Sequence, residues 1–224
     1  MSDHLPAVVV APRSGKPQGA LIWLHGLGAD GHDFVPALPA LPLEELGLKV
    51  VLPHAPARPV TINGGLVMPA WYDITGVDLE DRQDEEGVRA SAKAVESLVA
   101  REVAGGIPSE RIALVGFSQG GAVALFAGLR HRERLAGVAA LSTYLILGDA
   151  LERERSPTNG GLPVFHAHGR FDPVVRLQWG ELARDWLRAR GHPVDWHVYP
   201  MEHAVCPEEL ADLGRWLATI FSPR

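Results

Sequence analysis

The chain has 224 residues, of which 46% are hydrophobic, and its formal net charge is −6. These values suit a single α/β domain over residues 1–224 and argue against a nucleic-acid binder, which would show a basic patch. The one cysteine, Cys206, excludes an internal disulfide. Since no apolar run reaches about 18 residues and no secretory pattern opens the chain, we expect no membrane insertion and a cytoplasmic location.

Short apolar runs bounded by turn residues predict the first strands, at residues 8–11, 20–24 and 49–52. Between the last two, the segment 34–46 contains three prolines, so any helix there is short or broken. Residues 60–73 include Asn-Gly-Gly at 63–65, which indicates a hairpin-type turn between short extended pieces. Residues 84–103 carry apolar side chains at helical spacing and form the longest predicted helix.

The second half of the chain alternates strands and helices. The predicted elements are strand 112–115, helix 121–129, strand 138–141, a charged surface excursion at 148–161, strand 164–167, helix 174–190, strand 194–199 and helix 208–221. Such alternation predicts an α/β fold with a mostly parallel sheet. Ligands of these sheets bind beyond the carboxyl ends of the strands, so the loops that follow strands are where chemistry is expected.

One such loop contains Gly116-Phe117-Ser118-Gln119-Gly120, which matches the Gly-x-Ser-x-Gly nucleophile elbow. The motif requires a preceding strand and a following helix, and both are predicted here. It would expose the hydroxyl of Ser118 at the sheet edge, beside a helix N-terminus that favours developing negative charge. The alternative is a glycine-rich turn in which the serine only caps the helix.

A serine hydroxyl is a weak nucleophile, so it needs a base, and the base needs a third group to orient it. Asp172 follows strand 164–167 and His203 follows strand 194–199, so both are expected at the same edge as Ser118. The order Ser, Asp, His is the one used by α/β-hydrolases. The alternatives are an Asp-Pro turn for Asp172 and a solvent-facing loop for His203.

The oxyanion hole of such a site needs two N–H donors. One is expected from Gln119, directly after the nucleophile, and the other from Leu27, in the loop after strand 20–24. Residues 26–31 of that loop also read Gly-x-Gly-x-x-Gly, a dinucleotide fingerprint. The prolines that follow and the lack of an acidic residue after strand 49–52 argue against a nucleotide site.

Three further residues carry groups that can bind a metal or act as a nucleophile. His166 and His168 lie two apart on a strand and could share a metal, but no third ligand is evident, so packing and hydrogen bonding beside Asp172 are favoured. Cys206 has no elbow around it and is expected to be buried. We therefore expect neither a cofactor nor a metal.

Taken together, these motifs resemble the carboxylesterase, acyl-protein thioesterase and lysophospholipase family, and most closely its bacterial carboxylesterase branch. The resemblance also covers Pro53-His54-Ala55-Pro56, the run from Arg58 to Gly64, and Trp71-Tyr72-Asp73. It implies an α/β-hydrolase fold, with a mostly parallel central sheet, helices on both faces and no large cap domain. It also implies a substrate pocket shaped by the segment before the longest helix. The apolar residues of that segment could line the pocket or only pack the loop down. Pocket lining is favoured, and we expect Leu66, Met68, Trp71 and Val175 to line the pocket.

The sequence thus favours a cofactor-free serine carboxylesterase that acts on small to medium acyl esters. Thioester removal from acylated proteins and lysophospholipid deacylation are alternatives that use the same triad. A non-catalytic binding protein is a remote third, because the three catalytic residue types are intact. The expected partner is a small acyl ester, and a homodimer is common among such relatives.

Overall fold

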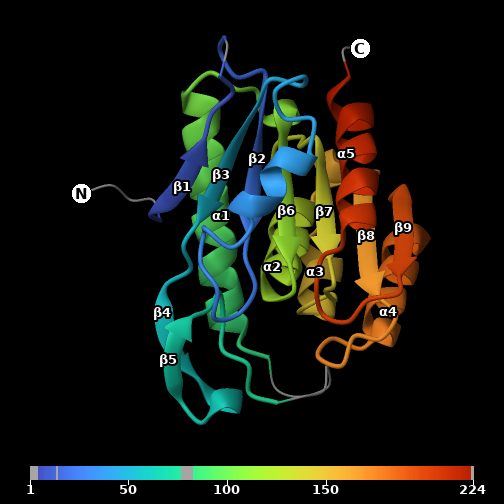
Figure 1. The fold of residues 1–224 in the computed structure, drawn as a ribbon. Coiled ribbons are helices and arrows are strands. Elements are labelled where there is room, and N and C mark those ends of the chain that lie inside the picture. Colours follow the sequence, from blue (N-terminus) through green and yellow to red (C-terminus); the bar gives the residue numbers. More distant parts are fainter. Residues whose placement is uncertain (1–4, 14, 77–82, 223–224) are drawn as a thin grey trace.

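The computed structural model describes residues 5–13, 15–76 and 83–222. Its core is a seven-stranded sheet with the strand order β1-β3-β2-β6-β7-β8-β9 (Figure 1). The strands are β1 (Ala7–Val10), β2 (Gly19–Leu24), β3 (Leu48–Pro53), β6 (Ile112–Phe117), β7 (Gly137–Leu141), β8 (Val164–Gly169) and β9 (Val194–Tyr199). Every pairing is parallel except that of β1 with β3. The predicted parallel sheet, with residues 8–11 at its edge, is confirmed.

Helices cover both faces of this sheet. They are α1 (Glu85–Ala104), α2 (Gln119–Arg130), α3 (Gly148–Glu154), α4 (Leu177–Ala189) and α5 (Pro207–Phe221), with 3₁₀ turns η1 (Val35–Ala40), η2 (Thr61–Asn63), η3 (Ser109–Arg111) and η4 (Pro157–Asn159). One apolar cluster packs the sheet against α1, α2 and α3, and a second packs its other face against η1 and α5. No helix in the described part of the chain has the length and apolar character to cross a bilayer.

A small hairpin stands apart from the sheet, beyond the carboxyl ends of its strands (Figure 1). Its strands, β4 (Ala57–Val60) and β5 (Leu66–Pro69), pair antiparallel around η2. Gly64 and Gly65 close the turn with φ values of 67° and 80°, a left-handed conformation that glycine adopts without strain. The predicted turn is confirmed, and β4 begins at Ala57, ahead of the extended pieces expected within residues 60–73.

Two helices differ from their predicted form. Residues 148–161 contain the helix α3, whose Leu151 is fully buried and whose Glu154 pairs with Arg89 and Arg130. These long-range contacts stabilise a seven-residue helix that local sequence does not reveal. Helix α4 begins at Leu177, three residues later than predicted, because Arg176 has an extended backbone with ψ 136° and no helix can run through it from residue 174.

Candidate active site

The turn between β6 and α2 has the strained backbone of a nucleophile elbow. Ser118 adopts φ 53° and ψ −121°, a conformation rarely populated by residues other than glycine. A Cβ atom on Gly116 would lie 2.3 Å from the carbonyl oxygen of Gly120, and one on Gly120 would lie 2.5 Å from that of His25. Both glycines of the motif are therefore required, because a side chain at either position would collide with a backbone carbonyl oxygen.

The imidazole of His203 lies between Ser118 and Asp172. Its Nε2 is 2.9 Å from Oγ of Ser118, and its Nδ1 is 2.6 Å from Oδ2 of Asp172. These side chains come from the loops after β6, β8 and β9. His203 lies 85 residues after Ser118 and 31 residues after Asp172 in the chain. The arrangement lets the hydroxyl donate to Nε2 while Nδ1–H donates to the carboxylate.

The carboxylate of Asp172 is buried and held in a fixed orientation. Its Oδ1 accepts from the backbone N–H groups of Val174 and Val175, each at 2.8 Å, which leaves Oδ2 for His203. Burial acts to raise the pKa of Asp172, but the hydrogen bonds from His203 and from these N–H groups outweigh it, and the net pKa lies below its ordinary value. The group is thus a carboxylate at neutral pH.

The loop after β2 lies against the elbow and is fixed by His25. The Nε2 atom of His25 accepts from the N–H of Ala55 at 3.1 Å, so the ring proton sits on Nδ1 and is donated to the carbonyl of Gly26 at 2.7 Å. Burial lowers the pKa of His25, which keeps the ring neutral. Within the described residues, the N–H groups of Leu27 and Gln119 donate to no protein acceptor. Both residues line the same pocket as Ser118.

The side chain of Gln119 connects the elbow to the segment that follows the hairpin. Its Oε1 accepts from the N–H of Trp71 at 2.8 Å, and its Nε2 donates to the carbonyl of Tyr72 at 2.7 Å. The indole N–H of Trp71 in turn donates to the carbonyl of His25 at 2.9 Å. The amide and the indole together therefore join the nucleophile helix, the loop after β2 and the segment after the hairpin.

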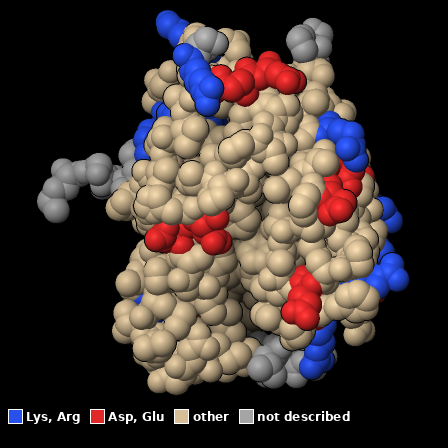
Figure 2. Space-filling model, viewed as in Figure 1, with Lys and Arg blue, Asp and Glu red and all other residues tan. Residues whose placement is uncertain are grey.

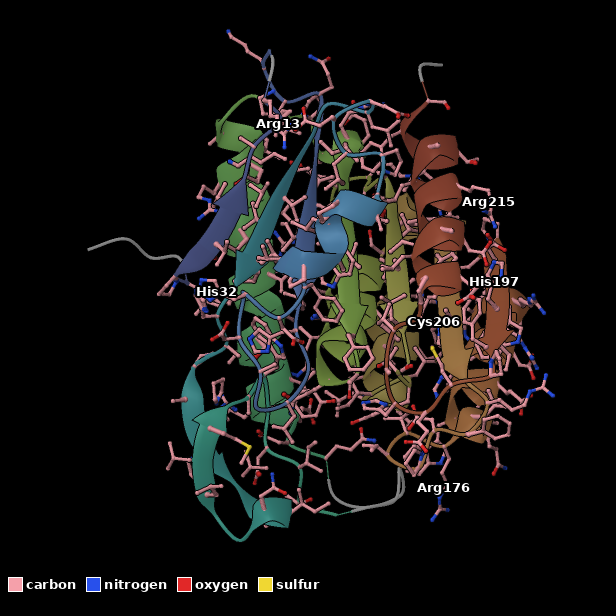
Figure 3. The ribbon with its side chains drawn as sticks, viewed as in Figure 1. Arg13, His32, Arg176, His197, Cys206 and Arg215 are labelled. Atoms are coloured by element: carbon pink, nitrogen blue, oxygen red, sulfur yellow. The ribbon has the colours of Figure 1, made fainter. Side chains whose placement is uncertain are left out.

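A pocket of about 740 Å³ opens above Ser118 and His203. Its walls come from the loop after β2, the hairpin segment, the loop after β7 and the start of α4, and they include Ile62, Asn63, Ile74, Phe117, Tyr144, Val174, Val175 and Trp179. Figure 2 shows a furrow beside the hairpin, in a part of this face with few charged side chains. Arg176 also lines the pocket and lies at the end of the molecule where the hairpin is found (Figure 3).

Of the four residues predicted to line the pocket, the structure places only Val175 there. The side chain of Leu66 is 64% exposed on the hairpin, and Met68 lies between Asn63 and Gly28. Trp71 is fully buried in the core, where its N–H bonds to His25. Residues of the 3₁₀ turn and those after Trp71 line the pocket instead, while substrate contact by Leu66, Met68 and Trp71 stays a prediction.

The pocket residues that the sequence did not reveal include Ile62, Tyr144 and Trp179. Tyr144 follows β7 at the same sheet edge as the catalytic loops, so its position after a strand was an available signal. Trp179 lies in the first turn of α4, where helical spacing alone does not distinguish a pocket residue from a packing residue. Its ring packs edge-on against Tyr144, with centroids 6.1 Å apart.

The two strand histidines are buried. His166 and His168 share a face of β8 and pack near Trp196, and burial lowers the pKa of His166 to about 3. His168 donates from Nε2 to the carbonyl of Val175 at 2.8 Å, which fixes the loop of Asp172. The predicted packing is thus confirmed for both histidines. The predicted hydrogen bond beside Asp172 is confirmed for His168. Cys206 is only partly buried, at the start of α5 (Figure 3).

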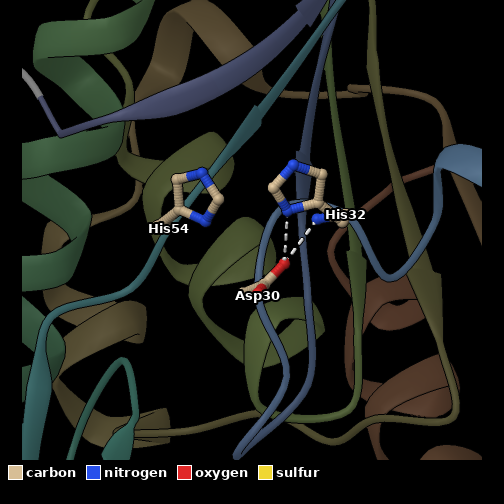
Figure 4. A group of neighbouring side chains, drawn as sticks. All are labelled: Asp30, His32 and His54. Carbon is tan, nitrogen blue, oxygen red and sulfur yellow. Dashed lines mark hydrogen bonds and ion pairs between the residues drawn. The ribbon is translucent and has the colours of Figure 1, made fainter.

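The ligand atoms of Asp30, His32 and His54 lie within 4.8 Å of one another (Figure 4). Hydrogen bonds within the protein account for this cluster. Asp30 Oδ1 accepts from the backbone and the ring of His32 at 2.7 and 3.0 Å, and His54 Nδ1 accepts from the N–H of Gly31 at 3.1 Å. These contacts join the loop after β2 to the end of β3, and we assign no metal to them.

A buried carboxyl follows the loop of His203. Glu209, in the first turn of α5, is fully buried, and burial raises its pKa to about 8 although the backbone of Cys206 acts in the opposite direction. In the unfolded chain this group ionises near pH 4.3. Between these values the unfolded state holds fewer protons, so the contribution of Glu209 to stability falls as pH rises.

The variant Glu209→Gln is neutral in both states and removes this dependence. We expect its free energy of unfolding, relative to the wild type, to increase steadily from pH 5 to pH 8, as measured by urea denaturation. Glu208→Gln, at the exposed neighbouring position, is the matched control and should show no such trend. A difference between Glu209→Gln and the wild type that stays constant with pH would contradict the assignment.

The parallel sheet, the strained elbow and the linked serine, histidine and aspartate define the class of the protein as an α/β-hydrolase. The chain belongs to the phospholipase/carboxylesterase family, whose model matches residues 5–221. It is 42% identical to acyl-protein thioesterase 1 of Mycosarcoma maydis, over 96% of this chain and 97% of that protein.

Solved structures agree with this assignment. Acyl-protein thioesterase 2 of Zea mays superposes with a TM-score of 0.87 at 30% identity, over 98% of this chain and 100% of that one. Esterase PE8 superposes with a TM-score of 0.82 at 26% identity, over 97% and 99% of the two chains. The protein is therefore a hydrolase of ester or thioester bonds.

Proposed function

We propose that the protein is a serine carboxylesterase that hydrolyses small to medium-chain acyl esters through an acyl-enzyme intermediate. The observation that carries this proposal is the continuous hydrogen-bonded path from Ser118 through His203 to Asp172. A strained serine, an imidazole within 3 Å and a fixed carboxylate are the components that nucleophilic acyl transfer needs.

In the proposed reaction, Ser118 Oγ attacks the substrate carbonyl while Nε2 of His203 takes its proton. The imidazolium then gives this proton to the leaving alcohol as the carbon–oxygen bond breaks. Water attacks the acyl-enzyme by the same route and releases the acid and the free serine. Throughout, Asp172 keeps the imidazole in the tautomer that presents Nε2 to the hydroxyl and stabilises its positive form.

The negative oxygen of each tetrahedral intermediate is assigned to the N–H groups of Leu27 and Gln119. Support comes from their free donors, from their place in the pocket wall beside Ser118, and from the helix N-terminus at Gln119. Because both donors belong to the backbone, their orientation depends on the His25–Gly26 bond and on the glycines that let the two loops meet.

A thioester substrate is the second candidate, because the relatives at up to 42% identity are named acyl-protein thioesterases. The same triad would serve, with a thiol in place of the alcohol as leaving group. The mostly apolar side chains of the pocket suit an acyl chain in either case. Deacylation of lysophospholipids is a third use of the same machinery, and no observation in the structure favours it over the other two.

One substrate series separates these functions. We would measure kcat/KM for p-nitrophenyl esters from acetate to palmitate, and for an oxygen ester and a thioester of the same acyl chain. For a carboxylesterase we expect a maximum at short to medium chains and no preference for the thioester. A maximum at the longest chains together with a preference for sulfur would establish the thioesterase instead. Absence of hydrolysis across the whole series would contradict both.

A further inference from the structure

Two tyrosine hydroxyls meet in the wall of the pocket. Oη of Tyr72 and Oη of Tyr144 are 2.8 Å apart. Tyr72 belongs to the segment held by Gln119, and only 1% of its surface is exposed. Tyr144, from the loop after β7, is partly exposed and lines the pocket, and its ring is held by the edge-on contact with Trp179.

The direction of this hydrogen bond follows from counting protons. Each hydroxyl carries one proton, and among the described residues neither hydroxyl has a partner other than the opposite tyrosine. If Tyr144 donated, the proton of Tyr72 would be left in the core without an acceptor, which is unfavourable. Tyr72 is therefore the donor, and the proton of Tyr144 remains available on the pocket side.

Both hydroxyls keep their protons at neutral pH. Burial raises the pKa of Tyr72 well above its ordinary value, and burial also raises the pKa of Tyr144 although the bond from Tyr72 acts in the opposite direction. Tyr144 thus keeps a neutral O–H group and belongs to the same pocket wall as Ile62, Ile74 and Val175. A donor in such a wall selects for one acceptor atom on the ligand.

We propose that the hydroxyl of Tyr144 is a specificity subsite for an oxygen atom within the chain of the substrate, separate from the ester group that reacts. The preferred substrates are then esters that carry an ether, hydroxyl or oxo oxygen in the acyl or the alcohol chain. This inference rests on the proposed hydrolysis at Ser118, and it adds a recognition element that the triad and the oxyanion hole do not supply.

The test uses matched ester pairs in which one CH₂ group is replaced by oxygen at successive positions. One series varies the acyl chain of p-nitrophenyl esters, and a second varies the alcohol chain of butyrate esters. For each pair we would measure the ratio of kcat/KM for the oxygen-containing ester to that for its CH₂ analogue. Both kcat/KM values of a ratio come from the same enzyme preparation. A smaller folded fraction in a variant therefore lowers both values equally and leaves the ratio unchanged.

At one position of one series, we expect this ratio to be about 3- to 10-fold higher in the wild type than in Tyr144→Phe, the range of a single neutral hydrogen bond. Tyr72→Phe should keep the wild-type ratio, because Tyr144 retains its own proton. The series in which the effect appears identifies the acyl or the alcohol chain as the part that Tyr144 contacts.

Three results would overturn the inference. Equal ratios in the wild type and Tyr144→Phe at every position of both series would show that the subsite does not exist. A loss of selectivity in Tyr72→Phe with none in Tyr144→Phe would reverse the proton assignment. Failure of the wild type to hydrolyse the unsubstituted esters would instead remove the proposed function on which the inference depends.

Discussion

Replacing Ser118 with alanine is expected to lower kcat at least about 1000-fold, because the members of a triad act as a unit and no other group supplies the nucleophile. Alanine tolerates the left-handed backbone at this position about as well as serine does, and the cap of α2 does not use the serine side chain. The fold should therefore persist. Hydrolysis of p-nitrophenyl butyrate, with circular dichroism to check folding, measures the effect.

Ser142 provides a matched control for this substitution. It follows β7 at the same sheet edge, has a φ of 45° and is fully buried, but it does not line the pocket. Ser142→Ala should keep activity within a few-fold of the wild type. A fluorophosphonate probe should label the wild type and Ser142→Ala but not Ser118→Ala. Near-normal hydrolysis by Ser118→Ala would rule out this nucleophile.

Asp172→Asn is expected to lower kcat by about 10³- to 10⁴-fold, as removal of the charge does in other triads. The backbone N–H groups of Val174 and Val175 need an acceptor, so the amide oxygen would stay on them and the NH₂ group would face His203. The ring would then accept at Nδ1 and carry its proton on Nε2, where it can no longer take the proton of Ser118.

A histidine–aspartate pair on β9 serves as control. His197 Nε2 is 2.8 Å from Oδ1 of Asp195, on the edge strand β9 (Figure 3). Asp195→Asn changes the same chemical contact outside the pocket and should leave kcat within about two-fold. If Asp172→Asn kept more than a tenth of wild-type activity, the carboxylate would not be orienting the base.

The fold was largely predictable because its determinants are local. Each buried parallel strand is a short apolar run, and turn residues mark its ends. The alternation of strands and helices could therefore be predicted from the sequence. Helix α3 was missed for the opposite reason. Its seven residues are mainly charged at the surface and show little helical periodicity. The contacts of Leu151 and Glu154 with distant helices cannot be predicted from the sequence.

The placement of the reacting groups was predictable from topology. In a parallel sheet the loops after β6, β8 and β9 must lie at one edge. The order of strands along the chain therefore predicts that Ser118, Asp172 and His203 are neighbours. The structure brings them within hydrogen-bonding distance. Their roles in catalysis remain a prediction, which the substitutions above test.

The pocket walls were the least predictable part. Apolar residues on the hairpin were expected to face the substrate, yet Leu66 points to solvent and Trp71 fills the core. Which side of a hairpin faces a cleft depends on how the whole segment is anchored, and here the anchors are the Gln119 amide and the bond from Gly28 to the carbonyl of Pro69. Neither contact follows from local sequence pattern.

The bridging amide of Gln119 has a consequence for engineering this scaffold. Its backbone N–H is assigned to the reaction, while its side chain fixes the segment from which Ile74 reaches the substrate. Selectivity and turnover thus both depend on Gln119. Libraries that diversify residues 71–76 will therefore also perturb the electrostatics beside the nucleophile. The wall at the start of α4 is linked to catalysis as well, because Val174 and Val175 line the pocket and hold Asp172 through their N–H groups.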